Sequence, residues 1–162
     1  MLDSLFKYKA WANESLLSEF EARSAEIPDA DRHACIRTLN HAYVVDRIFA
    51  AHLTGAAHGY TATNTTETPA LGELRRAVAE SDRWYLDYVG GLTPQALSEQ
   101  IAFAFTDGAA GRMSREEMLL HVALHSGYHR GQVGVRLPQL TSAPPQDTFT
   151  TYLHKLEPQR RG

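Results

Sequence analysis

Four long segments of this chain repeat apolar residues at intervals of three and four, and this pattern constrains the fold more than any other feature. The segments cover residues 3–23, 31–54, 69–89 and 115–137. This spacing places the apolar side chains on one face of an α-helix, where other helices can cover them. The pattern therefore predicts an all-α protein, a four-helix bundle whose helices are joined by loops.

In the first segment the predicted apolar stripe includes two aromatic residues, Tyr8 and Trp11. They stand at helical steps from other apolar residues, and we interpret them as core residues. The second segment stops at Gly55, which can end a helix in a left-handed conformation. These local signals agree with the helical prediction.

Helix-capping residues mark the predicted starts of the third and fourth helices. Thr68 and Pro69 predict an N-cap and a first helical residue for the third segment. Ser114 and Glu117 have the spacing of a capping box at the start of the fourth segment, which runs to Leu137. Both signals place a helix boundary to within a residue or two.

Shorter stretches complete the predicted fold. Residues 101–105 (IAFAF), followed by the turn sequence TDGAAG at 106–111, predict a short extended segment or hairpin. A proline-rich loop from Thr141 leads to a short C-terminal helix, Asp147 to about Leu156, which we expect to pack back on the bundle. Repeats and linkers are absent, so residues 1–162 are predicted to form a single domain.

The composition limits the partners and the cellular setting. The formal net charge of −3 gives no basic excess, which argues against nucleic-acid binding. Cys35 is the single cysteine, so an internal disulfide and a cysteine-based zinc site are both excluded. No run approaches the roughly 20 apolar residues of a membrane span, and the first residues lack the apolar core of a signal peptide. We therefore expect a cytoplasmic protein that binds neither nucleic acid nor a membrane.

The fourth segment carries three histidines, His121, His125 and His129, at intervals of four. On a helix they lie on one side, and neutral imidazole is a good ligand for transition metals. His121 and His129 are separated by about 12 Å of helix rise, so they cannot share an ion. The pair could be His121 with His125, or His125 with His129, and the spacing leaves this open. The alternative to a metal site is a polar surface stripe, or a core histidine with a hydrogen-bond partner.

His41 lies in the middle of the second segment and could join such a pair from a facing helix. It can do so only if the second helix lies beside the fourth. His33 and His52 lie too far from it along the helix to bind the same ion. Three protein ligands would leave a coordination position open, which is typical of catalytic rather than structural metal sites.

Several motifs stand in order along nearly the whole chain. They are YKAWAN at 8–13, TLNH at 38–41, VDRI at 45–48, HVALH at 121–125, YHRGQV at 128–133, and the proline and aspartate at 145 and 147. Taken together, and in this order, they resemble the DinB family of damage-inducible bacterial proteins, also described as DinB/YfiT-like metalloenzymes.

The resemblance implies an antiparallel four-helix bundle and one metal site. Its ligands would be His41, His125 and His129, holding one divalent transition metal, zinc or nickel. His121 would then lie one turn away as a structural or pocket residue. Leu124 stands where the family usually has a polar residue such as Asn or Asp, which puts a hydrogen bond behind the ligands in doubt.

Characterised relatives include enzymes that use mycothiol or bacillithiol, such as maleylpyruvate isomerase and S-transferases. The resemblance therefore implies a homodimer that acts on a small-molecule substrate, as a metal-dependent thiol S-transferase or hydrolase. The alternative is a metal-binding or stress-response protein without turnover. Arg130 could hold a carboxylate of a thiol cofactor, although an arginine here more often forms a surface or interface ion pair. Tyr43 and Asp46 are interpreted as structural, and no residue stands out as a general base.

Overall fold

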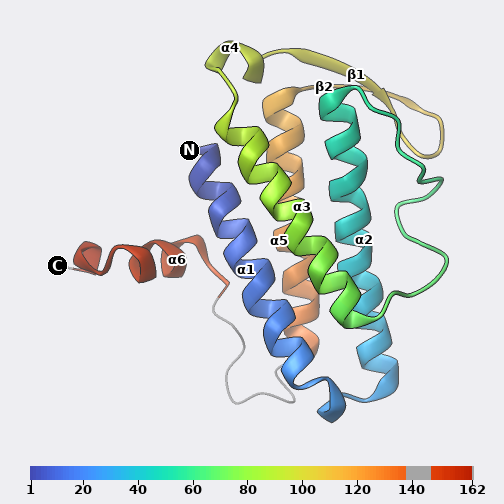
Figure 1. Cartoon of the computed structure of the whole chain (residues 1–162), viewed down its shortest axis with the longest axis vertical. Helices are drawn as coiled ribbons and strands as arrows, with labels where there is room; N and C mark the ends of the chain where they lie inside the picture. Colours follow the sequence, from blue (N-terminus) through green and yellow to red (C-terminus); the bar gives the residue numbers. More distant parts are fainter. Residues whose placement is uncertain (138–146, 162) are drawn as a thin grey trace.

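The computed structural model describes residues 1–137 and 147–161, and helices dominate it (Figure 1). The helical fold class is confirmed, with a small two-stranded sheet in addition. The long helices are α1 (Leu2–Ala22), α2 (Asp29–Thr54), α3 (Leu71–Gly90) and α5 (Arg115–Arg136). The shorter elements are the 3-10 turn η1 (Ser24–Glu26), α4 (Pro94–Leu97), β1 (Gln100–Ala104), β2 (Ala110–Ser114), α6 (Phe149–Leu156) and the 3-10 turn η2 (Pro158–Arg161).

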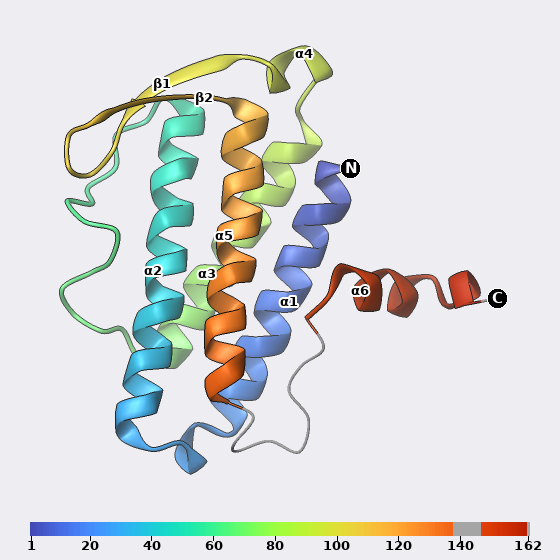
Figure 2. The ribbon, with the colours of Figure 1, turned by 180° about the vertical axis from the view of Figure 1, so that it is seen from behind.

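The four long helices lie side by side, as Figures 1 and 2 show from opposite sides. Helix α1 packs against α3 and α5, and α2 packs against the same two helices. The colours of Figure 1 show that α2 and α3 run in the same direction, because residues 55–70 return along the length of α2 before α3 begins. The predicted antiparallel arrangement of the bundle is therefore not confirmed, because α2 and α3 pack together in parallel.

Most predicted helix ends are found where the capping residues stand. Gly55 ends α2 with a left-handed φ of 67°, and Ser114 and Glu117 form the predicted capping box of α5. The predicted start of α3 at Thr68 and Pro69 is wrong, because that helix begins after Ala70. Just before it, the Asn64 side chain donates a hydrogen bond to the Arg37 carbonyl of α2, which ties the incoming chain to that helix.

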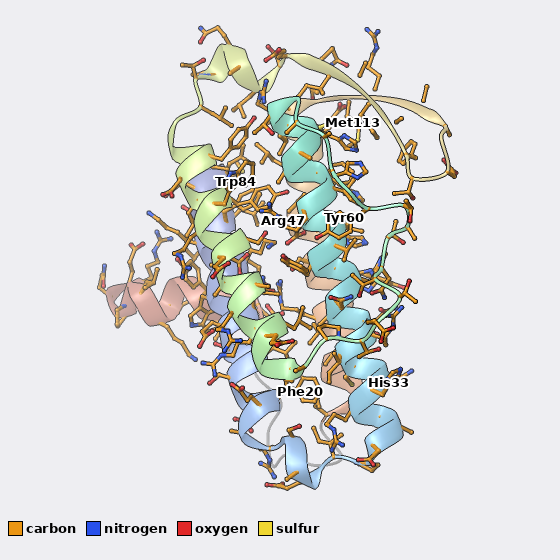
Figure 3. All side chains as sticks on the ribbon, turned by 45° about the vertical axis from the view of Figure 1, so that its right-hand side comes forward. Phe20, His33, Arg47, Tyr60, Trp84 and Met113 are labelled. Carbon is orange, nitrogen blue, oxygen red and sulfur yellow. The ribbon has the colours of Figure 1, made fainter. Side chains whose placement is uncertain are left out.

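The predicted hairpin is present and covers the end of the molecule where α2 ends and α5 begins (Figures 2 and 3). Its strands pair in antiparallel register, with Phe103 opposite Gly111. A Cβ atom at position 111 would lie 2.5 Å from the Phe103 ring, so glycine is required for the ring to lie across the partner strand. Phe103 and Met113 pack on the apolar residues beneath.

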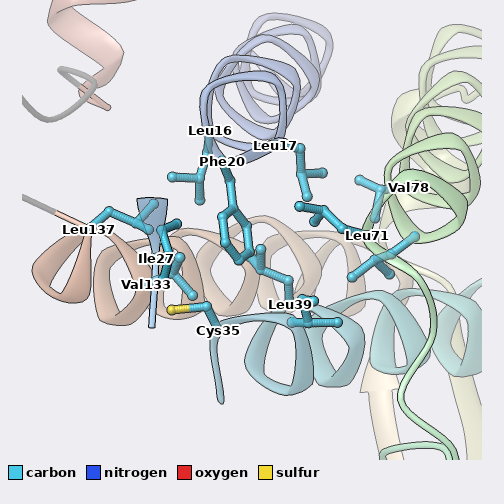
Figure 4. Close-up of a cluster of buried hydrophobic side chains, with 12 residues drawn as sticks. Leu16, Leu17, Phe20, Ile27, Cys35, Leu39, Leu71, Val78, Val133 and Leu137 are labelled. Carbon is cyan, nitrogen blue, oxygen red and sulfur yellow. The ribbon is translucent and has the colours of Figure 1, made fainter. Parts of the chain in front are cut away.

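Two apolar clusters hold the long helices together. The cluster of Figure 4 is built around Phe20 of α1, Cys35 and Leu39 of α2, Leu71 of α3 and Val133 of α5. The second cluster lies toward the hairpin and draws on the same helices. The second cluster contains Phe6, Val45, Phe49, Ala50, Leu53, Tyr85, Val89, Met118, Leu119 and Val122.

No helix within the described residues is long and apolar enough to cross a membrane.

A buried group of polar side chains also links the helices. Lys9 of α1 is only 1% exposed, and its Nζ lies 2.7 Å from Asp46 Oδ2 of α2 and 2.6 Å from Asp82 Oδ1 of α3. Burial alone would lower the pKa of Lys9, but the two carboxylates outweigh it and raise the pKa. Burial raises the pKa of Asp46 to about 6, against the opposing effect of Lys9. We call Lys9, Asp46 and Asp82 the buried ion triad.

Asn13 connects this triad to α5 and to the C-terminal segment. Its Nδ2 donates to Asp82 Oδ2 at 2.8 Å, and its Oδ1 accepts from Arg130 Nη1 at 3.0 Å. Arg130 Nε in turn donates to Asp147 Oδ2 at 2.6 Å. Arg130 is only 3% exposed, so the expectation of a surface or interface ion pair is wrong.

Helix α6 projects sideways from the long helices and is attached to α1 (Figures 1 and 2). The Tyr152 ring lies 5.6 Å from Trp11, and the Tyr8 hydroxyl donates to Asp147 Oδ1 at 2.5 Å. Tyr8 and Trp11 are therefore half-buried contacts for α6 rather than core residues. The proline-rich loop expected from Thr141 and the helix-ending Pro138 lie outside the described residues.

Candidate metal centre

Three histidines from α2 and α5 meet where these two helices pack together. One ligand atom each from His41, His125 and His129 lies within 4.8 Å of the other two, and this is the one such group of metal-ligating side chains in the described part of the chain. The Nε2 atoms of His125 and His129 are 3.1 Å apart. The His41 ring centre lies 5.0 Å from that of His125 and 4.7 Å from that of His129. The group could therefore hold a metal ion.

Helix geometry explains why these three residues meet. His125 and His129 stand one turn apart on α5, so their rings lie next to each other on one side of that helix. Helix α2 packs along α5 and presents His41 from the opposite side. The condition set by the sequence, that the second helix lies beside the fourth, is met.

Two hydrogen bonds orient the imidazole rings. His41 Nδ1 lies 2.7 Å from the Thr63 carbonyl oxygen, and His129 Nδ1 lies 2.8 Å from Gln132 Oε1. Because a carbonyl oxygen only accepts, each Nδ1 must carry the proton, and Nε2 keeps its lone pair for an ion. Metal-binding histidines are commonly held by such outer hydrogen bonds.

His125 differs from the other two histidines, because its buried Nδ1 has no hydrogen-bond partner in the described structure. Burial lowers the pKa of His125 to about 3, and the neighbouring His129, His121 and His41 add to the shift. Burial also lowers the pKa of His129. Both rings are thus neutral at pH 7, which is the form that binds transition metals.

The shifted pKa of His125 predicts a pH dependence for the metal-free protein. Below pH ~6.5 the unfolded chain protonates His125, whereas the folded protein does so only near pH 3. The free energy of unfolding should therefore fall as the pH is lowered from about 6.5, by at most about 1.4 kcal/mol per pH unit for this residue, and by less because the ring is partly exposed. Urea unfolding of the parent and of His125→Asn at several pH values measures this, and identical pH profiles would contradict it.

His121 stays outside the group of three and forms part of an aromatic wall beside it. Its ring stacks on His125, with centres 5.2 Å apart, and lies 4.6 Å from the Phe49 ring. Burial lowers the pKa of His121. Of the two pairs that the spacing left open, His125 and His129 are the pair that His41 approaches.

Asp46 and Arg130, which the sequence also singles out, have partners other than the three histidines. Asp46 belongs to the buried ion triad, which agrees with the structural interpretation. Arg130 is occupied by Asn13, Ser126 and Asp147, so its guanidinium is not free to hold a cofactor carboxylate. The histidine group and the buried ion triad therefore share no residue.

Sequence reasoning missed both groups that orient the rings. Gln132 stands three residues after His129, so it lies on the same side of α5, and this spacing could have identified it. Thr63 acts through its backbone carbonyl from a loop, 22 residues after His41. No residue pattern identifies a backbone acceptor at such a distance.

A family model described as the DinB family matches residues 1–161 of the chain. The match includes every long helix, the three histidines and α6. No curated protein and no solved structure matches the chain.

Proposed function

The chain belongs to the DinB family, and on this premise we propose that His41, His125 and His129 bind one divalent transition metal ion, zinc or nickel. The observation that carries the proposal is the convergence of three imidazole nitrogens within 4.8 Å of one another. The hydrogen bonds of His41 to Thr63 and of His129 to Gln132 support it, because they place the proton of each ring on Nδ1 and leave a lone pair on Nε2 for an ion. Three imidazoles suit both metals.

We further propose that the site is catalytic, for S-transfer from a low-molecular-weight thiol or for hydrolysis of a small-molecule substrate. A divalent ion would lower the pKa of a thiol or water bound to it and so supply a nucleophile at neutral pH. Three protein ligands leave a position for that group. Thr63 and Gln132 fix the ring orientations, while His121 and Phe49 form the aromatic wall on one side.

A second candidate is a metal-binding or stress-response protein without turnover. It is favoured by the absence, in the described residues, of any carboxylate or lysine within hydrogen-bond distance of the three histidines. Their hydrogen bonds go to Thr63, to Gln132 and to one another. A hydrolase would ordinarily need a general base at this place.

An activity screen separates these candidates. Protein loaded with zinc or nickel is supplied with mycothiol, bacillithiol or another low-molecular-weight thiol and an electrophile, and separately with activated esters. We expect turnover that disappears on chelation and in His129→Ala but survives in His121→Ala. A loaded protein with no turnover on any thiol or ester would support the second candidate.

The remaining parts of this proposal concern assembly and location. We propose that the family's four-helix bundle forms a homodimer, which light scattering tests. Support comes from large apolar side chains exposed along one face of α5, where Leu124 is 69%, Tyr128 64% and Val135 77% exposed. A cytoplasmic location stays a prediction from the sequence.

A further inference from the structure

A pocket lies between α2 and α3, and none of the three histidines lines it. Its volume is about 300 Å³, at the small end of the range for ligand pockets. Figure 3 shows Arg47 between the two helices, with Trp84 on α3 and Tyr60 on the loop that follows α2. The lining residues are Arg47, Ala50, Ala51, Thr54, Ala56, Ala57, His58, Gly59, Tyr60 and Trp84.

Arg47 is a half-buried cation without a counterion. Among the described residues no side chain or carbonyl accepts a hydrogen bond from its guanidinium, and none forms an ion pair with it. Arg115 and Arg130, by contrast, form ion pairs with Glu99 and Asp147. Because removing a charge from water without a partner is costly, the pocket is better suited to an anion than to water alone.

His58 supplies a second unsatisfied polar atom in the same pocket. Its Nδ1 is buried and has no hydrogen-bond partner in the described structure. The ring is held by edge-on packing against His52, with centres 5.2 Å apart. A ligand that carries hydrogen-bonding groups could therefore satisfy both Arg47 and His58.

The rest of the lining combines small residues with one large aromatic ring. Ala50 and Ala51 of α2 and Ala56 and Ala57 of the loop leave space that larger side chains would fill. Trp84 is fixed by stacking on Tyr88, with ring centres 4.9 Å apart and planes inclined by 14°. A flat apolar group fits such a wall better than a fully hydrated anion does.

We propose that this pocket binds a small organic carboxylate, with its flat apolar body against Trp84 and its carboxylate on Arg47. The planar guanidinium can hold a carboxylate through two parallel hydrogen bonds. Because Arg47 is the one arginine or lysine of the lining, and Trp84 offers a flat apolar surface, the pocket favours a monoanion with an apolar body over inorganic phosphate. The site uses none of the three histidines, so it goes beyond the proposed metal function and does not depend on it.

The test uses the full chain with Trp11→Phe, which leaves Trp84 as the one tryptophan. Benzoate is titrated while the indole emission is followed, and calorimetry gives the affinity independently. We expect saturable binding of benzoate. Benzamide, which lacks the charge, and phosphate, which lacks the apolar body, should bind at least about tenfold more weakly.

Variants locate the bound carboxylate. Arg47→Met keeps the aliphatic stem and should weaken benzoate binding at least about tenfold. Arg47→Lys keeps the charge but loses the two parallel hydrogen bonds of the guanidinium, so its affinity for benzoate should lie between those of Arg47→Met and the parent. Arg83→Met, which changes an exposed arginine on α3, should bind as the parent does. Metal-free protein and His129→Ala should also retain binding.

Several outcomes would overturn the proposal. These are no saturable binding up to about 10 mM benzoate, unchanged affinity in a folded Arg47→Met variant, or phosphate binding as tight as that of benzoate. Loss of benzoate binding in His129→Ala would indicate that the carboxylate binds at the histidine group instead, and this would equally contradict the proposal. Failure of the protein to bind metal would leave this pocket unaffected, so the two proposals fail separately.

Discussion

We expect that replacing His41, His125 or His129 with alanine weakens binding of zinc or nickel by about two to three orders of magnitude. Structural zinc sites with four ligands bind with an apparent free energy of about 10–16 kcal/mol, so one ligand corresponds to roughly 2.5–4 kcal/mol. The remaining two imidazoles cannot compensate, because no other metal-ligating side chain of the described residues joins this group. Competition with a chromophoric chelator measures the affinities.

Two variants on the same helix serve as matched controls. His121→Ala removes an imidazole one turn from His125 and should weaken metal binding modestly at most, because His121 lies outside the group of three. Gln132→Ala keeps all three imidazoles but removes the acceptor of His129 Nδ1, and should cost about ten- to a hundredfold in affinity. Normal metal affinity in His129→Ala would refute the ligand assignment.

The second large effect concerns stability. We expect that Lys9→Met lowers the free energy of unfolding by about 3–5 kcal/mol, because it leaves the buried carboxylates of Asp46 and Asp82 without their shared cation. Because Lys9 opposes the rise in the pKa of Asp46, this carboxyl should take up its proton at a higher pH in Lys9→Met than in the parent, and the loss should shrink as the pH falls toward about 6. Urea unfolding of the metal-free protein, with the slopes compared between variants, measures both.

Lys7→Met is the matched control for this variant. Lys7 stands on the same helix and pairs with Asp3, but both side chains are 55% exposed. Such a surface pair contributes little to stability, because water and salt screen its charges. If Lys9→Met were no more destabilising than Lys7→Met, the buried ion triad would not have the role assigned to it.

Much of the fold follows from the sequence because helix signals are local. Apolar spacing predicts the four long helices, and Gly55 and the Ser114 capping box predict two of their ends. The direction of α3 relative to α2 could not be predicted, because the path of residues 55–70 depends on contacts such as that of Asn64 with Arg37. Local pattern does not encode such long-range contacts.

The buried polar residues were harder to recognise. Lys9 and Asn13 stand one turn apart and lie buried with Phe6 and Phe20 on the core face of α1. A charged residue on an apolar face is a detectable signal, but its partners Asp46 and Asp82 come from other helices. The apolar stripe predicts a core position for Tyr8 and Trp11, because the stripe alone does not show that α6 covers them.

The histidine group shows where residue spacing stops being informative. Both candidate pairs on α5 have the same helical geometry, and only the register of α2 against α5 decides which pair His41 approaches. The family resemblance, rather than the spacing, pointed to His125 and His129. Arg130 was misjudged for a related reason, since its partner Asp147 lies in a separate segment of the chain.

Metal content of the purified protein, never exposed to a nickel column, tests the central proposal most directly. Mass spectrometry should find about one zinc or nickel ion per chain in the parent, the capacity expected of one three-histidine group. The ion should be absent from His41→Ala. A parent protein that holds no ion and takes up neither zinc nor nickel on titration would mean that the histidines are structural, and the proposed enzyme would have to be abandoned.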